Sequence, residues 1–84
     1  MSTTICVRYF AAARAAAGVD TEALDVADGT TIDDLVGMLT ARGPELARVL
    51  QRSSFLCDGM AVRDRGQSLR TNQTVDVLPP FAGG

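Results

Sequence analysis

The sequence contains no lysine, no histidine and no tryptophan, and all eight of its basic side chains are arginines. Histidine is the usual general base near neutral pH, and lysine forms Schiff bases and accepts isopeptide bonds. Their absence argues against self-sufficient acid–base or Schiff-base catalysis. It also excludes isopeptide chains built on the protein's own side chains.

Cysteine and long apolar runs are scarce as well. Cys6 and Cys57 lie far apart without CxxC spacing, which argues against a disulfide scaffold or a zinc site, and we expect both to be buried as small apolar residues. No apolar run approaches the ~20 residues that cross a bilayer, and Met1–Thr4 lacks the basic start of a signal peptide. We therefore expect a cytoplasmic protein without a membrane segment.

Length and charge describe a single small domain. The chain has 84 residues, 46% of them hydrophobic and 21% charged, with a net charge of −2. A chain of this size buries only about 60% of its unfolded surface, which leaves little room for a pocket of its own. Because the net charge is slightly negative, nucleic acid is not an expected partner.

Strand signals occur along the whole chain. Residues 4–10, 22–26 and 74–78 alternate or carry β-branched side chains, and the second of these is expected to pair antiparallel to the first. Asp58-Gly59 is a two-residue turn signal, which predicts a hairpin over residues 54–62. The strand side chains expected to share a face within each strand are Ile5, Val7, Tyr9, Leu24, Val26, Val75 and Val77.

Helix signals lie between these strands. The alanine-rich residues 11–17 end at Gly18, a suitable helix stop. Thr31 can cap an amphipathic helix that ends near Gly43, and Pro44 suits the first turn of another short helix. The apolar residues of the middle helix recur at i, i+3, i+4 and i+7 as Ile32, Leu35, Val36 and Leu39.

The order of these elements is strand, strand, helix, strand, short strand, strand. With a single well-defined helix to cover one face of the sheet, this order predicts a small α+β roll. In the polar stretch over residues 63–73, Leu69 is the expected anchor to the core, and Phe10 and Leu78 are expected in the core or at its edge. We predict a body over residues 1–78 and an extended tail over residues 79–84.

The chain ends in LPPFAGG. Pro79 and Pro80 cannot donate to a sheet ladder and favour extended geometry, so they should stop the last strand and direct the tail away from the body. Phe81 could anchor the segment in a partner's groove, and the narrow Ala82 and the diglycine that follows could thread a tight channel. An idle terminus is an equally consistent interpretation of the tail alone.

Four stretches of this sequence resemble the ubiquitin-like β-grasp sulfur carriers of the MoaD/ThiS family. These are VRYFAAARAAAG at the start, TIDDLVGMLTARGPEL at the family helix, CDGMAV at the hairpin and TVDVLPPFAGG at the end. The resemblance spans nearly the whole chain, and the PPxAGG ending favours the molybdopterin branch over the thiazole branch. It implies a β-grasp roll with a mixed sheet of four to five strands packed against one main helix.

The resemblance also implies a function. An E1-like adenylyltransferase would consume ATP to adenylate the carboxylate of Gly84, which follows Gly83, and a sulfur donor such as a cysteine desulfurase or a rhodanese would convert it to a thiocarboxylate. The chain would bind no cofactor itself. As small subunit of molybdopterin synthase, it would pass the sulfur to cyclic pyranopterin monophosphate in the large subunit, which would hold the catalytic side chains.

Residues 79–84 are the expected partner-binding segment, and Arg8 is a weaker candidate for the same role. Arg63, Arg65 and Arg70 could share the exposed side of the sheet with Arg8, although such charges more often form a solvated face. Three other functions stay open. They are sulfur delivery for cysteine or thiazole synthesis, a ubiquitin-like modifier of other proteins, and a plain interaction domain with an idle tail.

Overall fold

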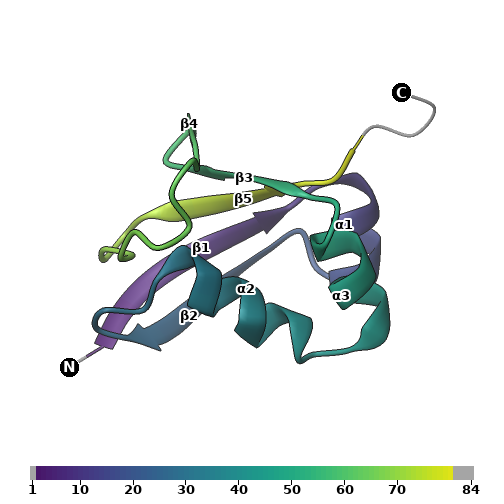
Figure 1. The fold of residues 1–84 in the computed structure, drawn as a ribbon. Coiled ribbons are helices and arrows are strands. Elements are labelled where there is room, and N and C mark those ends of the chain that lie inside the picture. The colour runs from purple at the N-terminus through teal and green to yellow at the C-terminus, as the bar shows by residue number, and fades with distance from the viewer. Residues whose placement is uncertain (1, 81–84) are drawn as a thin grey trace.

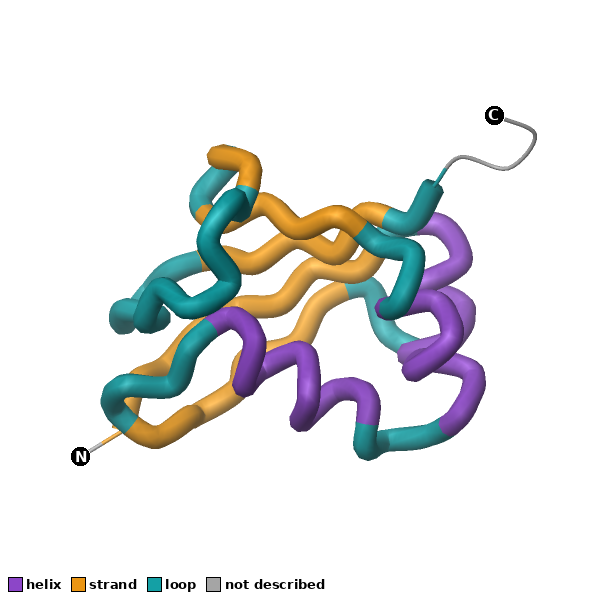
Figure 2. Tube along the Cα trace, in the orientation of Figure 1, coloured by secondary structure: helices purple, strands orange, loops and turns teal. Residues whose placement is uncertain are grey.

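The computed structural model describes residues 2–80, which form a five-stranded sheet with helices on one side (Figures 1 and 2). The strands are β1 (Ser2–Tyr9), β2 (Thr21–Ala27), β3 (Ser54–Cys57), β4 (Met60–Ala61) and β5 (Thr74–Leu78). The helices are α1 (Ala11–Ala17), α2 (Ile32–Thr40) and α3 (Pro44–Leu50).

The sheet has the strand order β2-β1-β5-β3-β4, in which β1 and β5 run parallel and the other neighbours run antiparallel. The antiparallel pairing of β1 with β2 confirms the prediction. The last strand of the chain therefore lies in the centre of the sheet, beside the first (Figure 1). This mixed sheet covered by helices is the β-grasp roll that the sequence resemblance predicted.

Alternation along β1 determines which of its side chains face the core. Ile5, Val7 and Tyr9 are at most 2% exposed. The other side of the strand carries Arg8, which is exposed, and Cys6, which is half-buried. The core also contains Val26, Ile32, Leu35, Val36, Leu39, Leu46, Leu50, Phe55, Cys57, Leu69, Val75 and Val77. This arrangement follows from the period of two along a strand and from the apolar stripe of α2.

Two local signals have the predicted geometry. Thr31 caps α2 with a capping box, in which its hydroxyl accepts from the Asp34 N–H and the Asp34 carboxylate accepts from the Thr31 N–H. Asp58 and Gly59 both have positive φ, 49° and 81°, as a two-residue hairpin turn between right-twisted strands requires. The hairpin and the start of α2 are therefore specified by short stretches of sequence.

The helical layer is larger than one main helix. α1 and α3 have seven residues each against nine in α2, and α3 buries Leu46 and Leu50. α1 ends at Gly18, whose φ of 82° lies in the left-handed region, as the sequence predicted. α2 ends at Thr40, earlier than the predicted end near Gly43, and α3 begins at Pro44 as expected.

The long polar loop between β4 and β5 is tied to the start of α2 by backbone hydrogen bonds, in which the Asp33 N–H donates to the Arg65 carbonyl and the Ile32 N–H donates to the Gln67 carbonyl. Leu69 is 4% exposed and its N–H donates to the carbonyl of Thr30, which confirms it as the anchor of this loop. Within residues 2–80, no helix has the combination of length and apolar character that is needed to cross a membrane.

Candidate functional site

The end of β5, where the chain leaves the sheet, is the candidate functional site. Because β1 and β5 are parallel, both strands have their C-terminal ends on the same side of the sheet, where Tyr9 lies opposite Val77. The N–H of Phe10 donates to the Val77 carbonyl at 3.3 Å. The start of α1 and the end of β5 are therefore joined, so whatever approaches the end of β5 also approaches Phe10.

The two prolines follow β5 directly. Leu78 is the last strand residue and pairs with Ser54, the first residue of β3. Pro79 is half-buried and Pro80 is exposed. The strand ends where the sequence predicted, because neither proline has an N–H to donate to the ladder. The role of both prolines in binding a partner stays a prediction.

The other predicted tail residues, namely Phe81, Ala82, Gly83 and Gly84, lie outside the residues that the structure describes. Their assigned roles in activation and partner binding stay predictions. What the structure places is the point from which they depart. That point is the C-terminal end of the central strand β5, near the start of α1 and the end of α3 (Figure 1).

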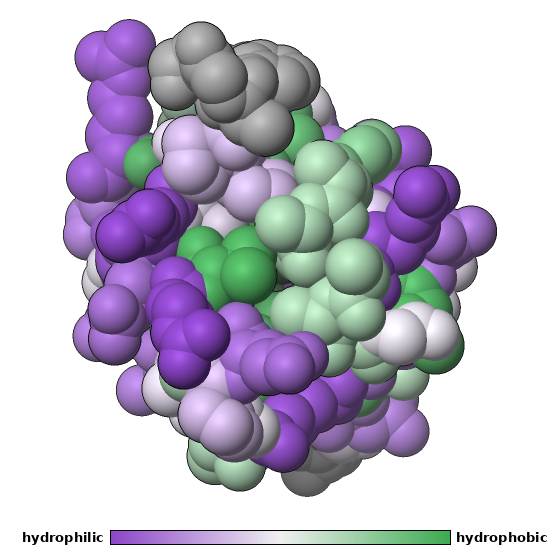
Figure 3. Space-filling view, turned by 90° about the vertical axis from the view of Figure 1, so that its right-hand side faces the viewer, coloured by the Kyte–Doolittle hydropathy of each residue, from purple (hydrophilic) through white to green (hydrophobic). Residues whose placement is uncertain are grey.

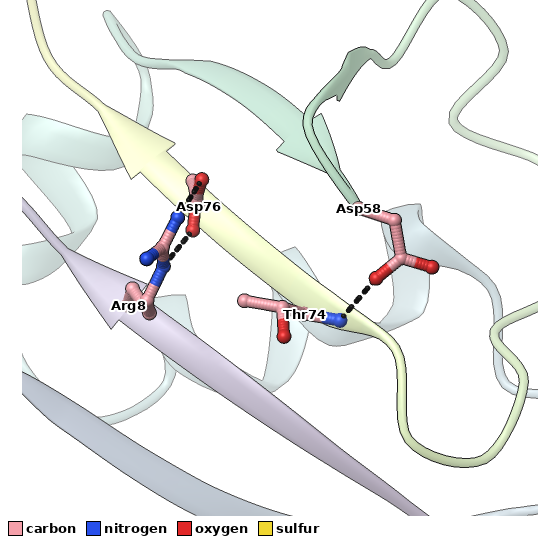
Figure 4. A network of polar contacts seen from close by, with 4 residues as sticks. All are labelled: Arg8, Asp58, Thr74 and Asp76. Carbon is pink, nitrogen blue, oxygen red and sulfur yellow. Dashed lines mark hydrogen bonds and ion pairs between the residues drawn. The ribbon is translucent and has the colours of Figure 1, made fainter.

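Arg8 lies on the face of the sheet that the helices leave open. Its guanidinium donates to both carboxylate oxygens of Asp76, at 2.6 Å and 2.7 Å (Figure 4). These bonds raise the pKa of Arg8 above its ordinary value, first through hydrogen bonding and then through the charge of Asp76. The guanidinium also lies 5.6 Å from the centre of the Phe10 ring. Arg8 is thus fixed beside Phe10 at the tail end of the sheet.

The structure does not place Arg65 beside Arg8. Arg65 instead forms an ion pair of 3.0 Å with Asp33 in the first turn of α2, and its guanidinium lies 5.4 Å from the Phe55 ring. The expectation of an arginine face on the sheet is therefore wrong for Arg65. Its loop folds toward the helical side because its carbonyl accepts from the Asp33 N–H at 2.8 Å.

Phe10 was expected in the core or at its edge, and this was wrong. Its side chain is 40% exposed, whereas Leu78 is half-buried as an edge residue would be. Phe10 directly follows Tyr9, which faces the core. The alternation of β1 therefore already contained the signal that Phe10 points to the opposite side.

A polar cluster that sequence reasoning missed ties β1 and β2 to the end of α2. The Tyr9 hydroxyl donates to Glu22 at 2.8 Å, and Arg42 donates two hydrogen bonds of 2.7 Å to the same carboxylate. The pKa of Glu22 is lowered, chiefly by the Arg42 hydrogen bonds. Burial, followed by the Glu22 hydrogen bond, raises the pKa of Tyr9. Every group has a partner, so the cluster is suited to holding elements together.

The two cysteines are free. Cys57 is buried as expected, and burial raises the pKa of its thiol, which makes it a poor nucleophile. Cys6 is half-buried, because it faces the open side of the sheet. Residues 2–80 contain no group of three or more potential metal ligands.

Comparison with known proteins gives consistent results. A family model described as the ThiS family matches residues 7–84. A molybdopterin synthase sulfur carrier subunit from Chlamydomonas reinhardtii is 32% identical over 81 residues, which cover 95% of this chain and 98% of that protein.

Two solved structures share the whole fold. The Haloferax volcanii HVO 2177 protein has a TM-score of 0.86 at 28% identity and covers 99% of this chain and 88% of its own. SAMP1 from Haloferax volcanii, a small archaeal modifier protein, has a TM-score of 0.82 at 25% identity and covers 96% and 99%. The likeness thus extends over both chains almost completely.

Proposed function

The chain belongs to the ThiS family, and from that premise we propose that it is a sulfur carrier for molybdenum cofactor biosynthesis. The observation that carries the proposal is the 32% identity, over nearly the whole of both chains, to a molybdopterin synthase sulfur carrier subunit. In this role the chain is the small subunit of the synthase. It delivers sulfur to cyclic pyranopterin monophosphate from its own C-terminus.

The proposed chemistry takes place on the carboxylate of Gly84. A carboxylate is a poor acyl donor, because its oxygen is a poor leaving group. Attack of one carboxylate oxygen on ATP forms an acyl adenylate and releases pyrophosphate. The outer sulfur of the donor's persulfide then displaces AMP and forms an acyl disulfide, and a thiol that acts as reductant cleaves the S–S bond, which releases a thiocarboxylate and leaves the thiol and the donor cysteine joined as a disulfide. The ionised sulfur of the thiocarboxylate is a nucleophile that needs no neighbouring base. The lack of histidine and lysine in this chain is consistent with such a role.

The proposal requires partners. An E1-like adenylyltransferase binds and consumes ATP, so this chain needs no cofactor of its own, and a cysteine desulfurase or rhodanese supplies the sulfur. The large synthase subunit receives the tail and contributes the catalytic side chains. These steps belong to the cytoplasm. The described geometry supports the proposal because the chain leaves the sheet at an edge where Phe10 and Pro80 are exposed.

A second candidate is a modifier that forms isopeptide bonds with lysines of other proteins. The similarity to SAMP1 at 25% identity favours it, since that structure is a small archaeal modifier protein. Both functions activate Gly84 in the same way and differ in the acceptor. Sulfur delivery for thiazole or cysteine synthesis differs from the first proposal in the acceptor alone.

The first experiment measures the intact mass of the chain after incubation with an E1-like adenylyltransferase, ATP and a sulfur donor. We expect a gain equal to the replacement of one oxygen by sulfur, and no gain in a matched chain that lacks Gly84. The thiocarboxylated chain is then mixed with a large synthase subunit and cyclic pyranopterin monophosphate. Return to the original mass together with formation of molybdopterin supports the proposed acceptor.

Two results would contradict the proposal. An unchanged mass, with the same enzyme active on another carrier, would remove the carrier function. A carrier that gains sulfur but yields no molybdopterin, and instead becomes linked to lysines of added proteins, would favour the modifier.

A further inference from the structure

A groove lies between α1 and α3, at the C-terminal end of β5. Its volume is about 250 Å³, and it is lined by Ala12, Arg48, Val49, Arg52, Pro79 and Pro80. A second hollow of about 290 Å³ shares Ala12, Arg48 and Val49 and continues along α1. Figure 3 shows this side of the molecule, on which apolar side chains gather in the middle with hydrophilic ones around them. The hollow lined by Arg8 and Phe10 shares no residue with the groove, which is therefore a separate surface.

The groove combines aliphatic surface with two cations. Its alanine, its valine and its two prolines carry no polar side-chain atom, and none of the lining residues is acidic. The remaining two lining residues, Arg48 and Arg52, are both exposed. The acidic Glu45 lines the adjoining hollow and not the groove itself. The groove therefore has an apolar floor and a positive rim.

These two cations are not neutralised by any other residue in the range 2–80. The ion pairs within that range belong to other arginines, namely Arg8, Arg14, Arg42 and Arg65. Glu45 lies three positions before Arg48 on α3, a spacing at which helical ion pairs commonly form. The two side chains nevertheless form none. Arg48 and Arg52 are thus available to carboxylates from outside the described residues.

Size and chemistry together indicate which occupant fits. A groove of about 250 Å³ is smaller than the roughly 300–1,000 Å³ of small-molecule sites, so it suits a side chain of a partner protein better than a cofactor. An apolar side chain desolvated in a pocket is a typical anchor of a protein interface. The planar fork of arginine binds carboxylates with two hydrogen bonds. A nucleic acid would engage the arginines and leave the aliphatic floor uncovered.

We propose that this groove binds a segment of a partner protein in which an aliphatic side chain is flanked by carboxylates. The aliphatic side chain packs on the floor beside Val49, and the carboxylates bind Arg48 and Arg52. The proposal goes beyond the sulfur-carrier function and requires no chemistry at the C-terminus. Because the two prolines of the groove follow β5 directly, a partner bound here is held at the end of the central strand.

Solution NMR of the full-length chain tests the proposal with a defined probe. The probe is the peptide Asp-Asp-Leu-Asp-Asp, blocked at both ends, and the control peptide is Asn-Asn-Leu-Asn-Asn, which has nearly the same shape without charge. We expect the probe to shift the methyl resonances of Ala12 and Val49 until they saturate, and to leave those of the core residue Leu35 unchanged. The control peptide should bind about tenfold more weakly, as the loss of two exposed ion pairs predicts. Unshifted Ala12 and Val49 resonances, or equal binding of the two peptides, would overturn the proposal.

Charge-neutralising variants test the role of the arginines. The double variant Arg48→Gln with Arg52→Gln should bind the probe about tenfold more weakly than the wild type. The matched variant Arg63→Gln with Arg70→Gln removes two other exposed arginines, which lie outside the groove and form no ion pair within residues 2–80. It should bind the probe as the wild type does. Equal losses in the two variants would show a nonspecific effect of net charge and contradict the assignment. Thermal unfolding verifies that both variants fold.

Two further results would assign the groove to a different occupant and overturn the proposal. Methyl shifts that depend on the concentration of the chain alone would indicate a second copy. An oligothymidine that shifts the same resonances at a lower concentration than the peptide would indicate phosphates. None of these experiments uses the activating enzyme. Their failure is therefore distinguishable from an unchanged mass in the sulfur-transfer experiment.

Discussion

Arg8 and Asp76 form a two-bond ion pair across the parallel strands β1 and β5, although they are separated by 68 positions in the sequence. The Asp76 side chain is 5% exposed, whereas that of Arg8 is 48% exposed. A carboxylate buried to this degree requires donors, and both of its oxygens accept from Arg8. At the start of β5, two residues before Asp76, the N–H of Thr74 donates to Asp58 in the hairpin turn (Figure 4).

We expect Arg8→Leu to lower the melting temperature of the protein, because it leaves the Asp76 carboxylate buried without its two donors. Adding Asp76→Leu to this variant should recover most of the loss, since removal of both charges leaves none unpaired. Thermal unfolding of the wild type, the two single variants and the double variant measures the coupling. Strictly additive effects would show that the pair is not coupled.

Phe10 is exposed and lies beside the end of β5, because its N–H donates to the carbonyl of Val77. If the chain docks on a large subunit there, Phe10→Ala should weaken binding about tenfold, a typical effect for an aromatic anchor. Met60→Ala is the control, because Met60 is 73% exposed on the edge strand β4. Titration calorimetry with the large subunit measures both. Equal affinities of the two variants would place the interface elsewhere.

Leu35 is fully buried on α2, whereas Met38 on the same helix is 48% exposed. Leu35→Ala should lower the free energy of unfolding by about 2–5 kcal/mol, because it creates a cavity in the core. Met38→Ala should change it by less than about 0.5 kcal/mol. Urea unfolding followed by circular dichroism checks both values. A similar loss for the two variants would contradict the described orientation of α2.

Glu22 should make stability depend on acid pH. Its pKa is lowered in the folded state, chiefly by hydrogen bonds from Arg42. The stability that Glu22 contributes is therefore complete above about pH 4.3, which is the ordinary pKa of glutamate. This stability is lost as the pH falls through the lower pKa of Glu22 in the folded state. Glu22→Gln should flatten this part of the stability curve, and the exposed Glu45→Gln should not. Unfolding measured between neutral and acid pH compares them, and identical slopes would count against the assignment.

Tyr9 should resist ionisation for as long as the fold persists. It is 2% exposed and donates to Glu22, and its pKa is raised by burial and by this bond. The unfolded chain ionises near pH 10, so the stability contributed by Tyr9 is complete below that pH and is lost as the pH rises beyond it. Tyr9 is the single tyrosine and the chain has no tryptophan, so phenolate absorbance reports on it alone.

We expect the absorbance change of this titration to coincide with the loss of the circular dichroism signal. A phenolate that appears near pH 10 with the fold intact would show that the Tyr9 hydroxyl is accessible to solvent.

Several elements could be predicted because their causes lie within a few residues. The alternation of Ile5, Val7 and Tyr9 identified the buried side of β1. The Asp58-Gly59 turn and the Thr31 cap depend on backbone geometry and side chains close in sequence. Helix ends were less well determined, as the end of α2 at Thr40 shows, because termination depends on which neighbours supply the last contacts.

By itself, the sequence determined the strand and helix periods, the absence of histidine and lysine and the PPFAGG segment. The tertiary structure decided which distant residues meet. It paired Arg8 with Asp76, left Phe10 exposed and brought Val49 beside Pro79 to form a groove. The physical reason is range: periodicity and capping act within one or two turns of chain, whereas the parallel pairing of β1 and β5 joins opposite ends of the sequence.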